Sequence, residues 1–552
     1  MPRIILTLCL GGTLAALGQT GATKQPPAQV SCHVYRSDTG APVDKAEVGF
    51  LPQDAPTSRA AGNSFVARTG PDGAFTMSNL PAGSYAVKAW RVGFTSYGCR
   101  GGGNADRESV DCKLLSVGPG EIAERVDLRL TPAGIIAGML VDDDQDPVAG
   151  VEADVLRLDY LPGGRRQLSL VATAVSDDQG RFRVAGLRPD TYYIRAGGLI
   201  RRPREEVPLK EGPSGGLQYR ETYYPGTALL DDAQALDVGP AEENSSIRIS
   251  LPTERTYTVW GTIVDPGQDA ARRASDVEAL KRADAEQTWG PGGVSIARDG
   301  SFTIRRVSPG DYTLIASAVD AGRRATAGFG WIQVVNADVH ATVELGRAGE
   351  MRGRIAEAQR LSSEGRRIVL ESTGMSIYPA DVDATGRFDV RNLPPGEYTF
   401  ALWDRGARPS ASYLKRISCG GKDYASRPLT LELGTVLDCD VTAADDAGAV
   451  SGRVALGGKP AANLVVVLIP ESRVMRRLPS FTRTAATDAA GQYKLAGAVP
   501  GDYFVFAVPQ SDDHVYFALD FADRHRADAK RVSVTPNGML VVDLQPPGQR
   551  LR

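Results

Sequence analysis

The chain has 552 residues, of which 42% are hydrophobic and 23% are charged, and it contains 61 Gly and 35 Pro. Its 63 basic and 66 acidic residues give a formal net charge of -3, so it lacks the basic surplus that nucleic-acid binding needs. This composition excludes a disordered chain and is typical of a multidomain protein rich in strands and turns.

An apolar segment stands at the N-terminus. Arg3 precedes the apolar run of residues 4–17, which closes on small residues and predicts a signal peptide over residues 1–18. A single-pass anchor is the alternative, but this run is shorter than the roughly 18 residues that span a bilayer. Because no later run reaches that length, we expect an exported chain without a membrane span after cleavage, located in the periplasm, on the cell surface or outside the cell.

One short pattern, which we call the cassette, recurs five times. In each copy a Gly is followed two residues later by Phe or Tyr and ten residues further by Tyr, with a Pro-bearing turn in between. The copies run from Gly73 to Tyr85, Gly180 to Tyr192, Gly300 to Tyr312, Gly386 to Tyr398 and Gly491 to Tyr503. A repeat at this spacing predicts about five copies of one β-domain.

Alternating residues flank each cassette. Phe75 and Met77 fall on one face of a strand, as do Phe302 and Ile304 in the third copy. Each copy also opens with a strand that carries a central Gly and closes with another alternating strand; in the first copy Cys32 replaces that Gly. A central Gly indicates close backbone approach or a bulge. Short strands separated by regular turn signals predict antiparallel β-sandwiches of about seven strands.

The predicted fold class is therefore all-β, a tandem array of about five Ig-like or prealbumin-like sandwiches. We expect them at residues 29–132, 133–254, 255–348, 349–446 and 447–546, with an insertion near 199–236 in the second. Residues 270–287 could form a charged helix or a strand, and their position in the repeat favours the strand. Few residues separate consecutive copies, so we expect the sandwiches to abut as a curved or extended rod.

Five cysteines follow the predicted signal peptide. Two close pairs, Cys99 with Cys112 and Cys419 with Cys439, are interpreted as local disulfides of an exported protein. Each would stabilise its domain by about 3 kcal/mol in the chain-entropy model. Metal ligation is the alternative, but neither pair has CxxC spacing or a neighbouring His.

The opening strand with Gly, the Asp-Gly-x-Phe turn of Asp72-Gly73-Ala74-Phe75 and the turn Asn392-Leu393-Pro394-Pro395-Gly396-Glu397-Tyr398 resemble carboxypeptidase regulatory-like domains. The resemblance spans nearly the whole chain after the signal peptide and implies a prealbumin-like, or transthyretin-like, sandwich with an accessory role in an exported bacterial protein. Asp190 departs from the pattern, since it replaces the turn Gly.

A second resemblance is to the stalk domains of Gram-positive pili. Their internal crosslink needs a Glu just before the turn, where this chain has residues such as Ser78 and Arg391. We therefore expect no isopeptide bonds.

Exposed aromatic residues are the candidates for ligand stacking. Trp90 and Trp403 each stand five residues after a cassette Tyr, on the opposite face of the strand, and Tyr223 and Tyr224 lie in the insertion. These rings could stack on sugars, or they could fill a domain junction or lie partly buried under a loop.

An acidic turn is a further candidate. Asp142, Asp144 and Asp146 alternate in a way that could bind calcium, but Pro147 stands where a calcium loop needs Gly. A plain acidic turn is the preferred interpretation.

Catalytic patterns are missing from the sequence. Zinc peptidases need an HxxE motif, and the four His here are not followed by Glu at that spacing. No GxSxG is expected at a strand-to-helix turn, and no Gly-rich phosphate loop follows a strand and opens a helix. We therefore expect no enzyme, no cofactor and no metal, but a non-catalytic exported scaffold, spacer or adhesion protein whose partner is an envelope protein or a polysaccharide. The alternative is a carbohydrate-binding protein that uses exposed aromatics.

Overall fold

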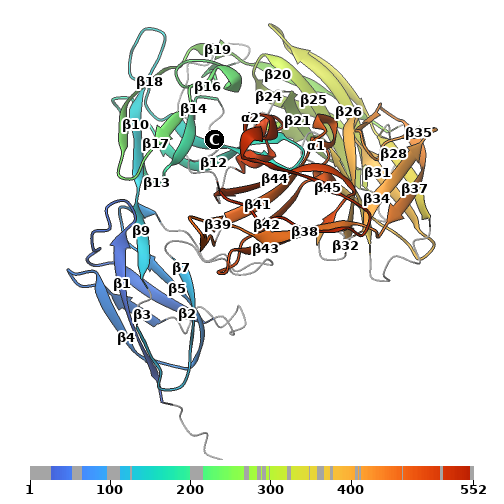
Figure 1. Ribbon diagram of the computed structural model, residues 1–552. Coiled ribbons are helices and arrows are strands. Elements are labelled where there is room, and N and C mark those ends of the chain that lie inside the picture. Colours follow the sequence, from blue (N-terminus) through green and yellow to red (C-terminus); the bar gives the residue numbers. More distant parts are fainter. Residues whose placement is uncertain are drawn as a thin grey trace, which may run out of the picture. The chain divides into compact units, whose positions relative to one another are not determined.

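The computed structural model is built almost wholly of strands (Figure 1). It describes residues 26–52, 65–95, 112–124, 127–198, 216–265, 273–282, 287–288, 294–297, 299–319, 325–346, 348–356, 366–372, 377–404, 408–409, 412–462, 464–509 and 514–546. The chain divides into two compact units, Met1–Ala133 and Gly134–Arg552. None of the helices in the described residues is long and apolar enough to cross a membrane.

Sandwich 1 forms the first unit. Its strands are β1 (Ala28–Arg36), β2 (Glu47–Pro52), β3 (Phe65–Arg68), β4 (Ala74–Leu80), β5 (Gly83–Trp90), β6 (Phe94–Thr95), β7 (Cys112–Val117), β8 (Ile122–Glu124) and β9 (Leu128–Pro132). They form the sheets β4-β1-β9-β6, where β8 also pairs with β1, and β3-β2-β5-β7. The two inner faces enclose a core that includes Phe50, Phe75 and Tyr85.

Sandwich 2 opens the second unit. Its strands are β10 (Gly134–Val141), β11 (Glu152–Leu161), β12 (Arg165–Val175), β13 (Arg181–Leu187), β14 (Asp190–Ala196), β15 (Leu217–Tyr219), β16 (Thr222–Tyr223), β17 (Leu236–Val238), β18 (Glu243–Ser250) and β19 (Thr253–Arg255), with the 3-10 helix η2 (Leu230–Asp232). The sheets are β13-β10-β18 and β12-β11-β14-β16, with β17 on β14. The described part of the predicted insertion thus contributes strands, and its β15 pairs with β19.

Sandwich 3 has two sheets of four strands. The strands are β20 (Tyr257–Val264), β21 (Arg273–Arg282), β22 (Gln287–Thr288), β23 (Val294–Ile296), β24 (Ser301–Val307), β25 (Gly310–Val319), β26 (Ala325–Val334) and β27 (Val339–Glu344). They are ordered β23-β24-β20-β27 and β22-β21-β25-β26. Strand β21 confirms the strand prediction for the ambiguous segment.

Sandwich 4 follows the same plan. Its strands are β28 (Gly349–Ala356), β29 (Arg367–Ser372), β30 (Ile377–Asp381), β31 (Arg387–Leu393), β32 (Gly396–Asp404), β33 (Arg408–Pro409), β34 (Tyr413–Cys419), β35 (Lys422–Asp423), β36 (Leu429–Leu431) and β37 (Val436–Ala444). The sheets are β31-β28-β37-β34-β35 and β30-β29-β32-β33, with β36 on β32.

Sandwich 5 adds short helices to the plan. The strands are β38 (Gly448–Arg453), β39 (Ala455–Leu456), β40 (Lys459–Pro460), β41 (Leu464–Pro470), β42 (Arg483–Ala486), β43 (Gln492–Ala498), β44 (Gly501–Pro509), β45 (Lys530–Val534) and β46 (Met539–Val541). The helices are α1 (Arg473–Arg476), η3 (Pro479–Phe481), η4 (Val515–Phe517), α2 (Phe521–Arg524) and η5 (Arg526–Asp528). Residues of η4 and α2 cover one face of the sheet β42-β41-β44-β45, which therefore has cores on both sides.

The predicted all-β array of sandwiches is confirmed. The structure adds a parallel pairing of the opening and closing strands. In each sandwich the opening strand lies between the cassette strand, which is antiparallel to it, and the closing strand, which is parallel to it. Sandwich 1 has the same arrangement, but its closing strand is split into β8 and β9.

The second aromatic residue of every cassette forms the same hydrogen bond. Each Tyr hydroxyl donates to the carbonyl oxygen four residues earlier, across the Pro-bearing turn. The bonds are Tyr85 to Pro81, Tyr192 to Arg188, Tyr312 to Ser308, Tyr398 to Pro394 and Tyr503 to Val499, at 2.5–2.9 Å. Since the rings are buried in the five cores, each bond satisfies a polar atom that burial would otherwise leave without water.

The central Gly of the opening strand is required by close packing against the closing strand. A Cβ at Gly261 would lie 1.7 Å from the carbonyl oxygen of Ala341, and one at Gly452 would lie 2.1 Å from that of Val542. Sandwich 1 admits Cys32 at this position, because β8 pairs with β1 only as far as Ser31 and β9 only from Val34 onward. Cys32 is buried in the core.

Candidate functional site

Of the two predicted disulfides, one lies in the described residues. Cys419 and Cys439 face each other across β34 and β37, both are buried, and their sulfurs are bonded. This prediction is confirmed. Cys99 lies outside the described residues and Cys112 begins β7, so their pairing stays a prediction.

The two tryptophans chosen from the sequence are partly covered. The Nε1 of Trp90 donates to a carboxylate oxygen of Glu47 at 2.7 Å, and its ring covers Gly49, where a Cβ would lie 2.9 Å from it. Trp90 therefore packs across the outer face of β2 and β5. Trp403 is half-buried near the end of β32, opposite Arg367 on β29.

The two tyrosines of the insertion belong to the packing of sandwich 2. Tyr223 keeps only 3% of its surface exposed, so its ring has no face for a ligand, and the stacking prediction is wrong for this residue. Tyr224 is half-buried and packs against the same core. The sequence alone could not show this, because burial of the insertion depends on its pairing with distant strands.

The acidic turn is held by its own backbone. A carboxylate oxygen of Asp142 accepts the backbone N–H groups of Asp144 and Asp146, at 3.0 and 2.9 Å. This local bonding explains the recurring Asp as a turn residue. In the described part of the chain no group of three or more His, Cys, Asp or Glu side chains could hold a metal ion.

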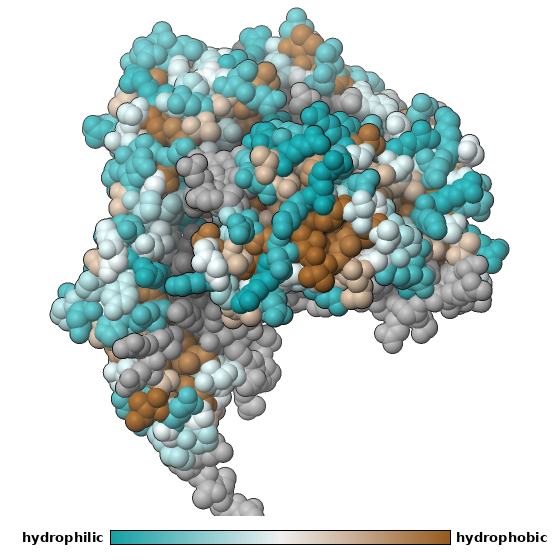
Figure 2. All heavy atoms as spheres, viewed as in Figure 1, coloured by the Kyte–Doolittle hydropathy of each residue, from teal (hydrophilic) through white to brown (hydrophobic). Residues whose placement is uncertain are grey.

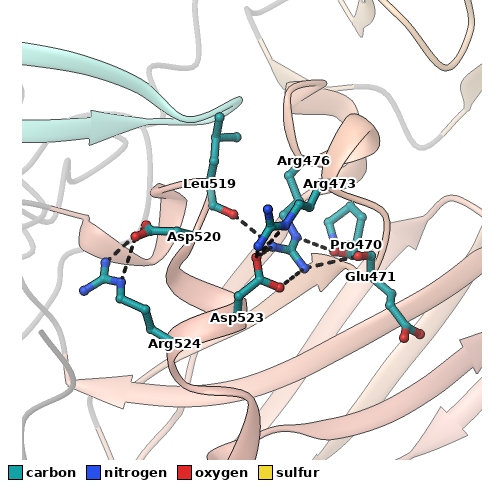
Figure 3. A network of polar contacts seen from close by, with 8 residues as sticks. All are labelled: Pro470, Glu471, Arg473, Arg476, Leu519, Asp520, Asp523 and Arg524. Carbon is teal, nitrogen blue, oxygen red and sulfur yellow. Dashed lines mark hydrogen bonds and ion pairs between the residues drawn. The ribbon is translucent and has the colours of Figure 1, made fainter.

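Sandwich 2 contacts sandwich 5 through the hairpin of β11 and β12. Strand β11 pairs with β14 only over Ala153–Leu156, whereas the hairpin of β11 and β12 extends beyond these residues and pairs with itself. Figure 3 shows the end of this hairpin beside Leu519. We call this contact between the hairpin and its neighbours the hairpin junction.

The hairpin junction is closely packed. The ring of Tyr160 joins the apolar cluster that α2 and η4 form over the outer face of β41 and β44. At the tip, Gly163 and Gly164 have positive φ, and a Cβ at Gly164 would lie 2.2 Å from Cγ of Leu519. The tip thus requires glycine both for its turn and for its close approach to sandwich 5.

The hairpin also reaches sandwich 4. Arg165 donates to the carbonyl oxygen of Ser372 at 3.2 Å, and its guanidinium lies 3.5 Å from the carboxylate of Glu371. Glu371 is buried, and burial raises the pKa of its carboxyl although Arg165 acts in the opposite direction. A buried ion pair of this kind is by itself weak evidence for the stability of the junction.

An arginine network fixes the helices that receive the hairpin (Figure 3). The guanidinium of Arg476 donates to the carboxylate of Asp523 and to the carbonyl oxygens of Pro470, Glu471 and Leu519, at 2.9–3.2 Å. The Arg476 bond also holds the pKa of Asp523 below its usual range. The network thereby joins helices α1 and α2 to each other and to β41. The outer surface of these helices is hydrophilic (Figure 2).

Other polar contacts join sandwiches that are consecutive in the chain. Gln218 of β15 donates to Glu254 at 3.0 Å and to Ser308 at 2.7 Å, which links the insertion to the cassette turn of sandwich 3. The hydroxyl of Tyr413 donates to Asp446 at 2.8 Å, and its ring packs in an apolar cluster with residues of sandwich 5. Within Gly134–Arg552, sandwich 2 therefore contacts sandwiches 3, 4 and 5. The sandwiches of this unit abut, as expected, but these contacts between sandwiches that are not consecutive are more than the expected curved or extended rod requires.

A shallow groove of about 690 Å³ lies on the outer face of β31, β28 and β37. Opposite charges face each other across its strands: Arg352 stands between Asp389 and Asp438, and Arg354 pairs in register with Asp440. The lining as a whole holds three Arg and five Asp side chains, so both signs are present with an acidic excess. The groove is therefore an open, mixed-charge surface and not an enclosed active site.

Several pilin structures align with parts of the chain. The minor pilin GBS52 of Streptococcus agalactiae is 15% identical over 42% of this chain and 97% of its own, with a TM-score of 0.22. The shaft pilin SpaA of Lactobacillus rhamnosus GG is 10% identical over 42% and 98%, with a TM-score of 0.19. The TIE protein of Bacillus anthracis is 10% identical over 75% and 74%, with a TM-score of 0.15. At these scores we infer no function from the likeness.

No family model matches the chain, and no curated protein matches it. The resemblance to carboxypeptidase regulatory-like domains therefore rests on the cassette residues alone.

Proposed function

We propose that this chain is a non-catalytic exported scaffold of the cell envelope or cell exterior, in which sandwiches 2 to 5 form one rigid support. The hairpin junction carries the proposal. It joins sandwiches that are far apart in the sequence through Tyr160, Gly164 and Arg165, and a chain of independently moving domains has no use for such contacts.

The junction can be loosened without disturbing the core of sandwich 2, because Tyr160 lies beyond the residues of β11 that pair with β14. We expect Tyr160→Ser in the full chain to speed hydrogen exchange in η4 and α2, as well as around Glu371, since these segments lose a packed neighbour. Leu170→Ser is the matched control, because Leu170 on the same hairpin is 49% exposed. Exchange that is the same in wild type and Tyr160→Ser would show that the junction does not hold the sandwiches.

The non-catalytic part of the proposal has a separate test. The purified chain should show no turnover of peptide, ester, phosphate or glycoside substrates above a heat-treated sample. Reproducible turnover that is lost on point substitution would contradict it.

Export is tested in a bacterial host by mass spectrometry of the accumulated protein. We expect a secreted form that lacks the first 18 residues, as the apolar run of residues 4–17 predicts. An untrimmed chain in the cytoplasm is the opposite outcome.

A further inference from the structure

Trp260 is a tryptophan that the search for exposed rings in the sequence missed. It lies on β20, at the centre of the sheet β23-β24-β20-β27, and half of its surface is exposed. The signal was present in the sequence, because Gly261 points into the core and its neighbour must then point to solvent.

The indole is held in place by a histidine. His340 lies opposite Trp260 in the register of β20 and β27, and the two ring centroids are 4.3 Å apart with an interplanar angle of 66°. This edge-to-face contact fixes the orientation of a ring that would otherwise rotate freely in water. The aromatic pair is therefore preorganised for a ligand.

Small hydroxyl side chains surround the pair. Thr303 faces Trp260 on β24, and Thr262, two residues along β20, faces Thr342 on β27. Thr262 and Thr342 are exposed, and Thr303 is half-buried. We call Trp260, His340 and these three threonines the Trp260 platform. None of its five members is an Asp, Glu, Lys or Arg.

Folding does not require an aromatic residue at this position. The residues that hold the same place in the other sandwiches, directly before the inward Gly or Cys32, are Ser31, Ala137, Arg352 and Ser451. They share neither size nor charge with Trp260. The tryptophan is thus a property of sandwich 3 and not of the repeated fold.

We propose that the Trp260 platform binds a neutral polysaccharide. A pyranose ring has an apolar face of C–H groups that can pack on the flat indole, while its rim of hydroxyls meets the threonine hydroxyls and the imidazole. The platform contains no Lys, Arg, Asp or Glu side chain, which suits a neutral sugar chain, although Arg305 is exposed two residues beyond Thr303 on β24. The proposal goes beyond the scaffold function and does not depend on the hairpin junction.

Affinity electrophoresis of the full chain tests the proposal, with hydroxyethyl cellulose, glycogen and galactomannan as neutral polymers and alginate as the anionic one. We expect at least one neutral polymer to retard the wild-type chain. Trp260→Ala should weaken that binding about tenfold or more, as is common when a central aromatic contact is removed. His340→Ala should weaken it several-fold, because the ring loses its orientation.

Trp331→Ala is the matched control, since Trp331 is 47% exposed on the other sheet of the same sandwich and should leave binding unchanged. Thermal unfolding of each variant shows whether sandwich 3 is intact. No retardation by any neutral polymer would overturn the proposal. Binding to alginate alone, or binding that Trp260→Ala leaves intact, would overturn it as well.

Discussion

The cassette tyrosine is the residue that most directly links sequence to fold in this chain. Its ring fills the core, and its hydroxyl closes the turn that delivers it, so one side chain fixes both the packing and the connection of two strands. Phenylalanine would supply the ring without the bond. The same residue therefore recurs in five sandwiches whose surfaces differ.

We expect Tyr398→Phe to lower the free energy of unfolding of sandwich 4 by about 1 kcal/mol, because the carbonyl of Pro394 loses its partner. Denaturant titration with a probe in sandwich 4 measures the change. Tyr424→Phe is the control, since it removes a hydroxyl from a partly buried ring outside the turn. An equal loss in both variants would contradict the assigned role.

The same variant should change the response to alkaline pH. Burial raises the pKa of Tyr398, so its stabilising contribution is complete below the unfolded value of about 10 and is lost as the pH rises above it. Tyr398→Phe should therefore flatten the fall in stability above about pH 10. A slope identical to wild type would show that this hydroxyl does not titrate with unfolding.

At the scale of elements, the tie between α1 and α2 decides whether sandwich 5 can receive the hairpin. Asp523→Asn should destabilise sandwich 5 by about 1–3 kcal/mol, because the buried guanidinium of Arg476 loses its counter-ion. Solvent screening makes the upper end of this free-energy range less favoured, since about a third of the Asp523 side chain is exposed. Thermal or denaturant unfolding measures the loss.

The contribution of Asp523 to the stability of sandwich 5 should be lost in acid. Arg476 lowers the pKa of Asp523 in the folded state, so the contribution is complete above the unfolded value of about 3.9 and is lost as the pH falls below it. Asp520→Asn is the control, because its exposed ion pair with Arg524 contributes about 0.5 kcal/mol or less. Equal acid sensitivity of wild type and Asp523→Asn would contradict the assignment.

Elements whose signals are local were predictable from the sequence. The cassettes and the pair Cys419 and Cys439 follow from alternation and spacing within about 20 residues, and the strand within residues 270–287 follows from its position in the repeat. The parallel pairing of opening and closing strands and the helices of sandwich 5 were not predicted. Strand pairing across a whole domain, and single-turn helices stabilised by one arginine, leave no periodic signal.

The candidate site was less predictable from local sequence signals than the fold. Strand parity correctly placed Trp90 on an outer face, yet its hydrogen bond to Glu47 and its packing over Gly49 depend on a neighbouring strand. The hairpin junction brings Gly164 and Leu519 together across more than three hundred residues of sequence. Such contacts follow from the packing of whole sandwiches, which no short pattern encodes.

For the whole molecule, the two compact units should unfold separately. The core of sandwich 1 is complete within the first unit, so we expect residues 26–133 and residues 134–552 to fold as separate fragments. Calorimetry of the fragments should reproduce the transitions of the full chain. A fragment 134–552 that melts well below its counterpart in the full chain would show that the units stabilise each other.

The parallel pairing of opening and closing strands has a mechanical consequence. In sandwich 2, for example, β10 and β18 run side by side in the same direction, so the chain enters at one end of this ladder and leaves at the other. A force that stretches the chain then loads the inter-strand hydrogen bonds in shear, all at once, instead of opening them one after another. Under tension, a sandwich of this plan would resist extension at its parallel ladder before it came apart.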